Sequence, residues 1–132
     1  MKTIFITGSN RGIGLELTRQ LLRSGNRVLA GSRDPEKAES LRALQREFEQ
    51  LEILRLSVDQ EDSVLSCFDQ LASENRKVDL LFNNAGIIDW SNLNEVSPDS
   101  LEEVYRTNLI GALLVLRASL PCLRKSSDPL VV

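Results

Sequence analysis

Short apolar runs alternate along this 132-residue chain with longer stretches in which apolar residues recur at helical spacing. The run Thr3–Thr7 is rich in β-branched and aromatic residues, which is typical of a strand buried on both faces. The stretch Gly12–Ser24 that follows has Leu17 and Leu21 four residues apart, as on one face of a helix. Gly25 then favours a helix end. The chain therefore opens with a strand and a helix, and the same alternation continues along it.

Four further strands and three further helices are predicted from this pattern. The strands are expected at Arg27–Gly31, Leu51–Leu56, Val78–Phe82 and from Pro129 onward. The helices are expected from Asp34, as N-cap, to Phe48, from Glu61 to Asn75, and from Ser97 to Leu123 with an irregularity on the way. The third strand is more polar than the first, as an edge strand can be.

A chain that alternates strand and helix in this way forms right-handed crossovers, which place the strands in one parallel sheet with helices on both faces. We therefore predict an α/β, Rossmann-like doubly wound fold with strand order 3-2-1-4-5, truncated at the fifth strand. No repeat, linker or low-complexity segment interrupts the pattern, so residues 1–132 are expected to form a single domain. In such a sheet a ligand binds beyond the carboxyl ends of strands 1 and 4, where the winding direction reverses.

The composition limits the classes of function. Sixteen basic and nineteen acidic residues give a net charge of −3, which favours neither nucleic acid nor an anionic membrane as a partner. The chain has no histidine, so a Ser-His-Asp triad, a histidine metal site and a histidine proton shuttle are excluded, and no metal ligand is predicted. Cys67 and Cys122 lie far apart in apolar helical patterns, which indicates two reduced thiols in a cytoplasmic protein. No signal peptide is predicted, and no apolar run is expected to approach the ~18 residues of a membrane span.

The first strand leads directly into a helix through the turn Thr7-Gly8-Ser9-Asn10-Arg11-Gly12-Ile13-Gly14. Glycines in this context indicate a dinucleotide-binding turn, because they permit a tight turn, a close backbone approach to a pyrophosphate and close packing of helix against strand. The amides near Gly12, Ile13 and Gly14 are the free donors of a helix N-terminus, which suits an anion. A glycine-rich turn with no ligand is the alternative.

The spacing of this turn, T-G-x-x-x-G-x-G, resembles that of the short-chain dehydrogenases/reductases. Two further motifs of that family follow on the expected elements: Asn83-Asn84-Ala85-Gly86 ends the fourth strand, and Asn108 lies in the last helical stretch. The resemblance covers essentially the whole chain. It implies an oxidoreductase that transfers hydride between a nicotinamide dinucleotide and a carbonyl or alcohol. It also implies that the cofactor is held by Gly8, Asn10, Arg11, Gly12, Ile13, Gly14, Ser32, Arg33, Asp59, Asn83, Asn84, Ala85 and Gly86.

The end of the second strand bears on which dinucleotide is bound. A carboxylate there would hold the ribose diol of NAD and repel a 2′-phosphate, but the chain has Ser32 and then Arg33 at that point. Arg33 and Arg11 offer charge-assisted contacts to a 2′-phosphate, and family members that prefer NADP carry basic residues at these two places. NADP(H) is therefore predicted in preference to NAD(H). Asp34 departs from the pattern of basic residues at this strand end, because it is acidic. The proline after it indicates that Asp34 is a helix cap.

Two of the implied cofactor residues have structural alternatives. Asp59 matches the family position that contacts the adenine edge, but it could equally act as N-cap of the helix that starts near Glu61. Asn83 is expected to have at least half of its role inside the protein, because a buried asparagine can tie neighbouring strands together.

Most of the catalytic groups implied by the resemblance are absent from these residues. Family members use a tyrosine as general acid/base, a lysine four residues later that lowers its pKa, a serine that orients the substrate and an asparagine in a proton relay. Only the asparagine has a counterpart, Asn108. The single tyrosine, Tyr105, is followed four residues later by Leu109 rather than lysine, and it is expected to be a packing residue. The chain alone is therefore not expected to be catalytically competent.

Three interpretations of function stay open. The chain is a partial form of an NADP(H)-dependent oxidoreductase acting on a small carbonyl or alcohol compound, a catalytically inactive cofactor-binding or interaction protein, or an incomplete product without a function of its own. The second interpretation includes a homo-oligomer or pairing with a full-length family subunit. Candidates for the exposed apolar surface that pairing would use are Leu113, Leu114, Leu116 and Leu120.

Overall fold

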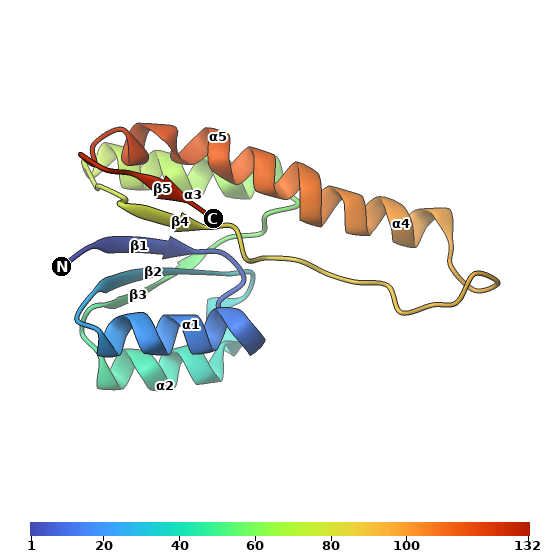
Figure 1. Cartoon of the computed structure of the whole chain (residues 1–132), viewed down its shortest axis with the longest axis horizontal. Helices are drawn as coiled ribbons and strands as arrows, with labels where there is room; N and C mark the ends of the chain where they lie inside the picture. Colours follow the sequence, from blue (N-terminus) through green and yellow to red (C-terminus); the bar gives the residue numbers. More distant parts are fainter.

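Five parallel strands form a twisted sheet between two layers of helices in the computed structural model, which describes the whole chain from Met1 to Val132 (Figure 1). The strands are β1 (Thr3–Ile6), β2 (Arg27–Ser32), β3 (Leu51–Arg55), β4 (Leu80–Phe82) and β5 (Leu130–Val131). Their order is β3-β2-β1-β4-β5, and every pairing is parallel. This is the Rossmann-like order predicted from the sequence, with the polar strand β3 at an edge.

Two helices cover each face of the sheet. Helices α1 (Gly12–Arg23) and α2 (Glu39–Glu47) lie on one side, while α3 (Glu61–Ser73) and α5 (Ala112–Leu123) lie on the other (Figure 1). Helix α4 (Pro98–Tyr105) runs through π-helical residues Arg106–Gly111 into α5, so the irregularity expected in the last helix is a π-helical segment. Figure 1 shows α4 and the loop before it extending beyond the carboxyl ends of the strands.

Alternating side chains along each strand sort the core into two clusters. On β1, Ile4 and Ile6 belong to the cluster under α1 and α2, while Phe5 belongs to the cluster under α3 and α5, as the two-residue period of a strand requires. The ring of Phe5 packs on that of Phe68, with centroids 4.8 Å apart. Each such fully buried side chain stabilises the fold by roughly 1.5–3 kcal/mol relative to an exposed one.

The start of the second helix differs from the prediction. Asp34 holds the N-cap position, with Pro35 after it as predicted, but of a 3₁₀ turn, and its side chain makes no capping hydrogen bond. Its carboxylate pairs with Lys37 at 3.4 Å. A 3₁₀ turn, η1 (Pro35–Lys37), intervenes, and α2 begins only at Glu39. The prediction of Asp34 as N-cap of the α-helix is therefore wrong.

The last helix also corrects two predictions. Tyr105 is 56% exposed rather than packed, because α4 extends past the sheet. Leu114 is buried on the inner face of α5, so it cannot belong to an exposed patch, whereas Leu113 is exposed as expected. The exposed apolar stripe begins further back, at Leu101.

The continuous helix Pro98–Leu123 has 26 residues and an 18-residue window of mean hydropathy 1.2, of which 28% is buried. By length and composition alone it could cross a membrane, which corrects the expectation that no segment approaches that size. Core helices of soluble proteins have the same composition, and here Val115, Cys122 and Leu123 pack into the cluster under α3 and α5.

Asp79 lies just before β4 at the amino end of the sheet and is 7% exposed. Its carboxylate accepts hydrogen bonds from the Thr3 amide (2.9 Å) and the Ser126 hydroxyl (2.7 Å) and pairs with Lys77 at 3.0 Å. Burial raises the pKa of this carboxyl, but the hydrogen bonds and the Lys77 ammonium outweigh burial, and the pKa lies below its ordinary value. Asp79 therefore joins β1, β4 and the segment before β5 through a charged group.

Candidate functional site

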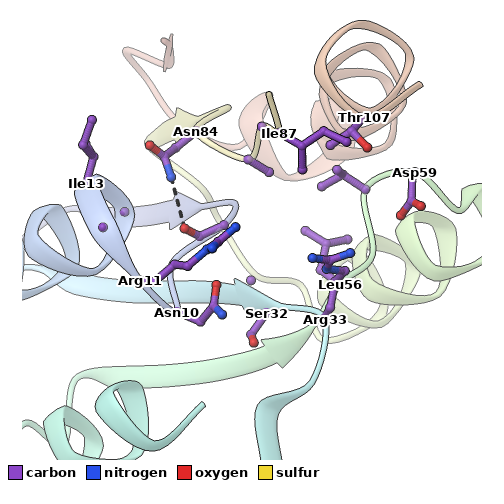
Figure 2. Close-up of a pocket in the computed structure, with 17 residues that line it drawn as sticks. Asn10, Arg11, Ile13, Ser32, Arg33, Leu56, Asp59, Asn84, Ile87 and Thr107 are labelled. Carbon is purple, nitrogen blue, oxygen red and sulfur yellow. Dashed lines mark hydrogen bonds between the residues drawn. The ribbon is translucent and has the colours of Figure 1, made fainter. Parts of the chain in front are cut away.

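A cavity of about 450 Å³ opens at the carboxyl ends of the strands and is lined by 17 residues (Figure 2). Its volume lies within the range of small-molecule sites. Twelve of the thirteen residues implied as cofactor ligands line it: Gly8, Asn10, Arg11, Gly12, Ile13, Gly14, Ser32, Arg33, Asp59, Asn84, Ala85 and Gly86. The structure thus brings together segments that are up to 78 residues apart in hydrogen-bonded contact, at the edge of the sheet where a doubly wound fold binds ligands.

The start of α1 presents unpaired backbone donors to this cavity. The helix begins at Gly12, and no side chain caps it. The first amide of the helix with a backbone acceptor is that of Leu15, which donates to the Arg11 carbonyl at 3.2 Å. The amides of Gly12, Ile13 and Gly14 therefore have no acceptor within the helix, and together with the helix dipole they offer donors that suit an anion.

Close packing at the glycine turn sets the shape of that end. A Cβ atom at Gly14 would lie 2.2 Å from the Gly8 carbonyl oxygen and 2.5 Å from the Asn84 amide nitrogen, so only glycine fits. Gly8 itself has φ +65°, and a Cβ there would lie 2.8 Å from the Ala85 Cα atom. The two glycines therefore let the turn, the helix and the end of β4 approach one another.

Hydrogen bonds across the sheet join the glycine turn to the segment after β4. Asn84 donates from Nδ2 to the carbonyls of Thr7 and Gly8, at 3.1 Å each. Figure 2 marks one hydrogen bond of Asn84 with a dashed line. The Ala85 amide donates to the Thr7 hydroxyl at 2.9 Å. These bonds hold the two walls of the cavity in a fixed relation.

Two arginines flank the β2 side of the cavity. Figure 2 shows Arg11 and Arg33 on either side of Asn10 and Ser32. The side chains of neither Arg11 nor Arg33 take part in the ion pairs of the protein, which involve Arg19, Arg55, Arg76, Arg117, Lys37 and Lys77. The carboxyl end of β2 thus combines two unneutralised guanidinium groups with the buried hydroxyl residue Ser32.

Asp59 lines the cavity beyond the end of β3. Gln60, not Asp59, is the N-cap residue of α3, and no side chain caps that helix. The Ser63 hydroxyl instead accepts a hydrogen bond from the Ser57 amide at 2.9 Å. The alternative interpretation of Asp59 as a helix cap is therefore wrong, while its contact with a ligand stays a prediction.

Five further residues line the cavity without having been implied as cofactor ligands: Gly31, Leu56, Val58, Ile87 and Thr107. Three of them lie at or just beyond the ends of β2 and β3, so the rule that ligands bind at carboxyl strand ends could have found them. Leu56 and Val58 are also members of the hydrophobic core. Their apolar character carries no signal that separates a cavity wall from the interior.

Two expected residues, Asn83 and Asn108, are not among the residues that line the cavity. The Asn83 amide nitrogen Nδ2 donates to the Ala112 carbonyl at 3.5 Å, which gives this side chain the internal role that was expected in part. Asn108, which lies in the π-helical segment, donates from Nδ2 to the Ile87 carbonyl and accepts from the Ile87 amide through Oδ1, at 2.8 Å each. Both functional atoms of Asn108 therefore fix the backbone that continues from Gly86 along the cavity.

The family model described as short chain dehydrogenase matches residues 2–132. The chain belongs to the short-chain dehydrogenase family. An uncharacterised oxidoreductase of Schizosaccharomyces pombe is 33% identical over 133 residues, which cover 99% of this chain and 53% of that protein. Retinol dehydrogenase 8 of Homo sapiens is 34% identical over 129 residues, which cover 94% of this chain and 40% of that protein.

Solved structures of the family share the fold. The NADPH-bound carbonyl reductase from chicken fatty liver superposes with a TM-score of 0.92 at 31% identity, over 99% of this chain and 57% of that one. The chain spans about half the length of the curated relatives it matches. Its five strands therefore correspond to about half of a longer short-chain dehydrogenase, namely the part to which this chain aligns.

Proposed function

We propose that the cavity binds NADP(H) and that the chain is the cofactor-binding part of a short-chain dehydrogenase acting on a carbonyl or alcohol. The carrying observation is the pair of unneutralised guanidinium groups, Arg11 and Arg33, beside Ser32 at the end of β2. A carboxylate there would repel a 2′-phosphate, whereas these groups attract it. The NADPH bound by the chicken carbonyl reductase supports the same choice.

The donor set of the cavity fits the remaining parts of a dinucleotide. The free amides of Gly12, Ile13 and Gly14 suit the diphosphate, because they are oriented donors at a positive helix end. The apolar wall of Leu56 and Val58, with the carboxylate of Asp59 beside it, suits an adenine ring with its amino edge. The segment Asn84–Gly86 is left for the ribose and nicotinamide.

NADPH, when bound, would supply a hydride for reduction of a carbonyl. The contribution of these residues is to bind and orient it: the helix end and the two arginines hold its phosphates, and Asn108 fixes the wall at Ile87. Tyr105, the single tyrosine among these residues, has no lysine four residues later, and we propose that proton transfer needs a group outside them. We therefore propose that this chain alone binds cofactor without turnover. A cytoplasmic location stays a prediction.

Fluorescence titration with NADPH and NADH tests the cofactor assignment. We expect Arg33→Ala to raise the Kd for NADPH by roughly 10- to 100-fold, the value of one charge-assisted contact, and to change the Kd for NADH little. Arg27→Ala, at the opposite end of the same strand, is the matched control and should change neither. Equal losses for both nucleotides in Arg33→Ala would contradict the 2′-phosphate assignment.

Steady-state assays with NADPH and a panel of ketones and aldehydes test the absence of turnover. No consumption of NADPH above the buffer rate is expected. Turnover that Tyr105→Phe abolishes would overturn the proposal, because it would make that residue the proton donor.

A second proposed function is pairing with another subunit of the same family. It is favoured by an apolar stripe of Leu101, Tyr105, Leu109 and Leu113, four residues apart and 54–56% exposed. These residues run from α4 through the π-helical segment into α5, and an exposed apolar stripe is typical of an interface. Light scattering should give a mass above 14.8 kDa, and Leu109→Glu should return it to that of one chain. A monomeric wild-type protein at high concentration would exclude self-pairing and leave a different family subunit as the partner.

A further inference from the structure

The connection Arg33–Lys37 between β2 and α2 carries the arginine proposed to bind the 2′-phosphate. Arg33 is exposed and its guanidinium has no ion-pair partner, so nothing bonded to the side chain itself fixes where it points. The backbone sets the position from which this side chain projects, and so the region that its guanidinium can reach. The contacts of that backbone therefore bear on cofactor choice.

Arg55, the last residue of β3, holds this connection. It lies opposite Ser32 in the parallel register of β2 and β3. Its Nη1 donates to the Arg33 carbonyl at 3.2 Å, and its Nη2 lies 2.8 and 2.7 Å from the two carboxylate oxygens of Glu36. One guanidinium group thus binds the peptide of Arg33 and the side chain three residues later.

The other contacts of the connection do not reach Arg33. Arg42 of α2 donates to the Glu36 carbonyl at 3.1 Å, and Lys37 pairs with Asp34 at 3.4 Å. The peptide between Ser32 and Arg33 is held by the Leu56 amide, which donates to the Ser32 carbonyl at 2.8 Å. On the carboxyl side of Arg33, the Arg33 carbonyl is bound by Arg55 alone. Glu36 keeps the Arg55 guanidinium in place at the far end of that contact.

We propose that Arg55, anchored by Glu36, is a positioning residue that orients Arg33 and so contributes to the preference for NADPH over NADH. The inference rests on the proposed function of the cavity. A planar guanidinium that binds two groups at once adds geometric definition, which a lysine ammonium lacks. Arg55 and Glu36 are 59% and 69% exposed, so the effect is expected to be modest.

Single substitutions separate positioning from simple charge. Arg55→Ala should raise the Kd for NADPH about three- to fivefold, the size expected for an exposed ion pair, and leave the Kd for NADH unchanged. Arg55→Lys keeps the charge but loses the fork, so it should weaken NADPH binding nearly as much. Glu36→Ala should also weaken it, although removing a carboxylate near a phosphate would strengthen binding if charge alone acted. Wild-type affinity in Arg55→Lys, or tighter NADPH binding in Glu36→Ala, would overturn the proposal.

A double-mutant cycle tests whether Arg55 acts through Arg33. In the Arg33→Ala background, Arg55→Ala should produce no further loss of NADPH affinity, because the group it positions is gone. An additive loss would overturn the positioning role and make Arg55 an independent charge. The matched control is Arg117→Ala, which breaks an equally exposed ion pair with Glu61 away from the cavity and should leave both Kd values unchanged. Thermal melting of each variant checks that it is folded.

The two hypotheses fail in different ways. If Arg33→Ala itself leaves NADPH affinity unchanged, the 2′-phosphate assignment is wrong. If Arg33→Ala removes the preference for NADPH but neither Arg55→Ala nor Glu36→Ala alters it, the assignment stands and the positioning role is wrong.

Discussion

The two ends of the sheet differ in what their polar groups bind. At the amino end, the polar groups of Asp79 are satisfied within the protein by Thr3, Ser126 and Lys77. At the carboxyl end, the first amides of α1 and the guanidinium groups of Arg11 and Arg33 lack protein partners and face a cavity. A charge neutralised inside the fold stabilises it, while charges and donors left open are available to a ligand.

This contrast suggests a division of roles: residues at the amino ends of the strands stabilise the fold, and residues at the carboxyl ends bind the ligand. Residues of one chemical type should affect stability when they are changed at the amino end and affinity when they are changed at the carboxyl end. Paired substitutions at the two ends test that separation directly.

The largest effect is expected from Gly14→Ala at the carboxyl end. Its Cβ atom would lie 2.2 Å from the Gly8 carbonyl oxygen, so the helix start must move and the amides lose their alignment. The Kd for NADPH should rise roughly 100-fold or more, which is about 2.7 kcal/mol. Gly25→Ala, in the turn before β2, is the control: its φ is +78° but nothing lies within 4 Å, so it should cost about 1–2 kcal/mol of stability and no affinity. Unchanged NADPH binding in Gly14→Ala would show that this packing does not shape the site.

Asp79→Asn should give the next largest effect, on stability alone. We expect a loss of about 2 kcal/mol in the free energy of unfolding at pH 7, as for hydrogen bonds to a charged group. The folded-state pKa of Asp79 is lowered, so its contribution is present above the unfolded pKa of about 3.9 and is lost as the pH falls through the folded value. Urea unfolding from pH 7 to pH 2.5 should therefore show the two proteins converge in acid. A constant difference across this range would contradict a charge-based role, and a changed NADPH affinity would contradict the separation of the two ends.

A smaller effect is expected from Asn84→Ala, which removes the donor that joins β4 to the Thr7 and Gly8 carbonyls. The loss of about 1 kcal/mol should appear mainly as a roughly fivefold rise in the Kd for NADPH. Asn26→Ala makes the same change at the amino end, where Asn26 bonds Lys2 and Leu21. That variant should lower the melting temperature by a few degrees and leave the Kd unchanged. Reversed outcomes at the two asparagines would break the comparison.

The smallest effect is expected for the reactivity of the two cysteines, Cys67 and Cys122, in the interior between the two ends of the sheet. Burial raises the pKa of the Cys67 thiol to about 12 and raises that of Cys122 as well, so neither forms the reactive thiolate near neutral pH. A colorimetric thiol assay at pH 8 should find no reactive thiol in the folded protein and two in denaturant. Rapid modification of either thiol without denaturant would mean that the core under α3 and α5 opens.

The elements were predictable because local patterns decide them. Strand β3 and helix α3 end within two residues of their predicted limits, and the switch point between β1 and β4 follows from the alternation alone. The glycine turn was found because each glycine has a steric reason. The limits of prediction lie where a role depends on distant partners. Ile13 repeats with the apolar residues of α1 yet is 79% exposed, because the helix start extends past the sheet toward the cavity.

The contacts of Asn108 could not be predicted either, because they also depend on residues distant in the sequence. Neither its two bonds to Ile87 nor the contact of Arg55 with Arg33 has a local signature. Leu56 and Val58 resemble any core residue until the cavity beside them is known. Such roles arise from tertiary packing, which a single sequence does not encode residue by residue.

The π-helical segment Arg106–Gly111 changes the direction in which the side chains after it point, relative to an unbroken α-helix. Each residue of an α-helix advances the side-chain direction by about 100°, and a wide turn absorbs one residue more than an α-turn does. The segment therefore lets the Asn108 side chain contact Ile87 while Val115, further along the same continuous helix, packs into the core. Deleting a single residue from this segment is expected to restore α-helical geometry and to turn Asn108 away from Ile87.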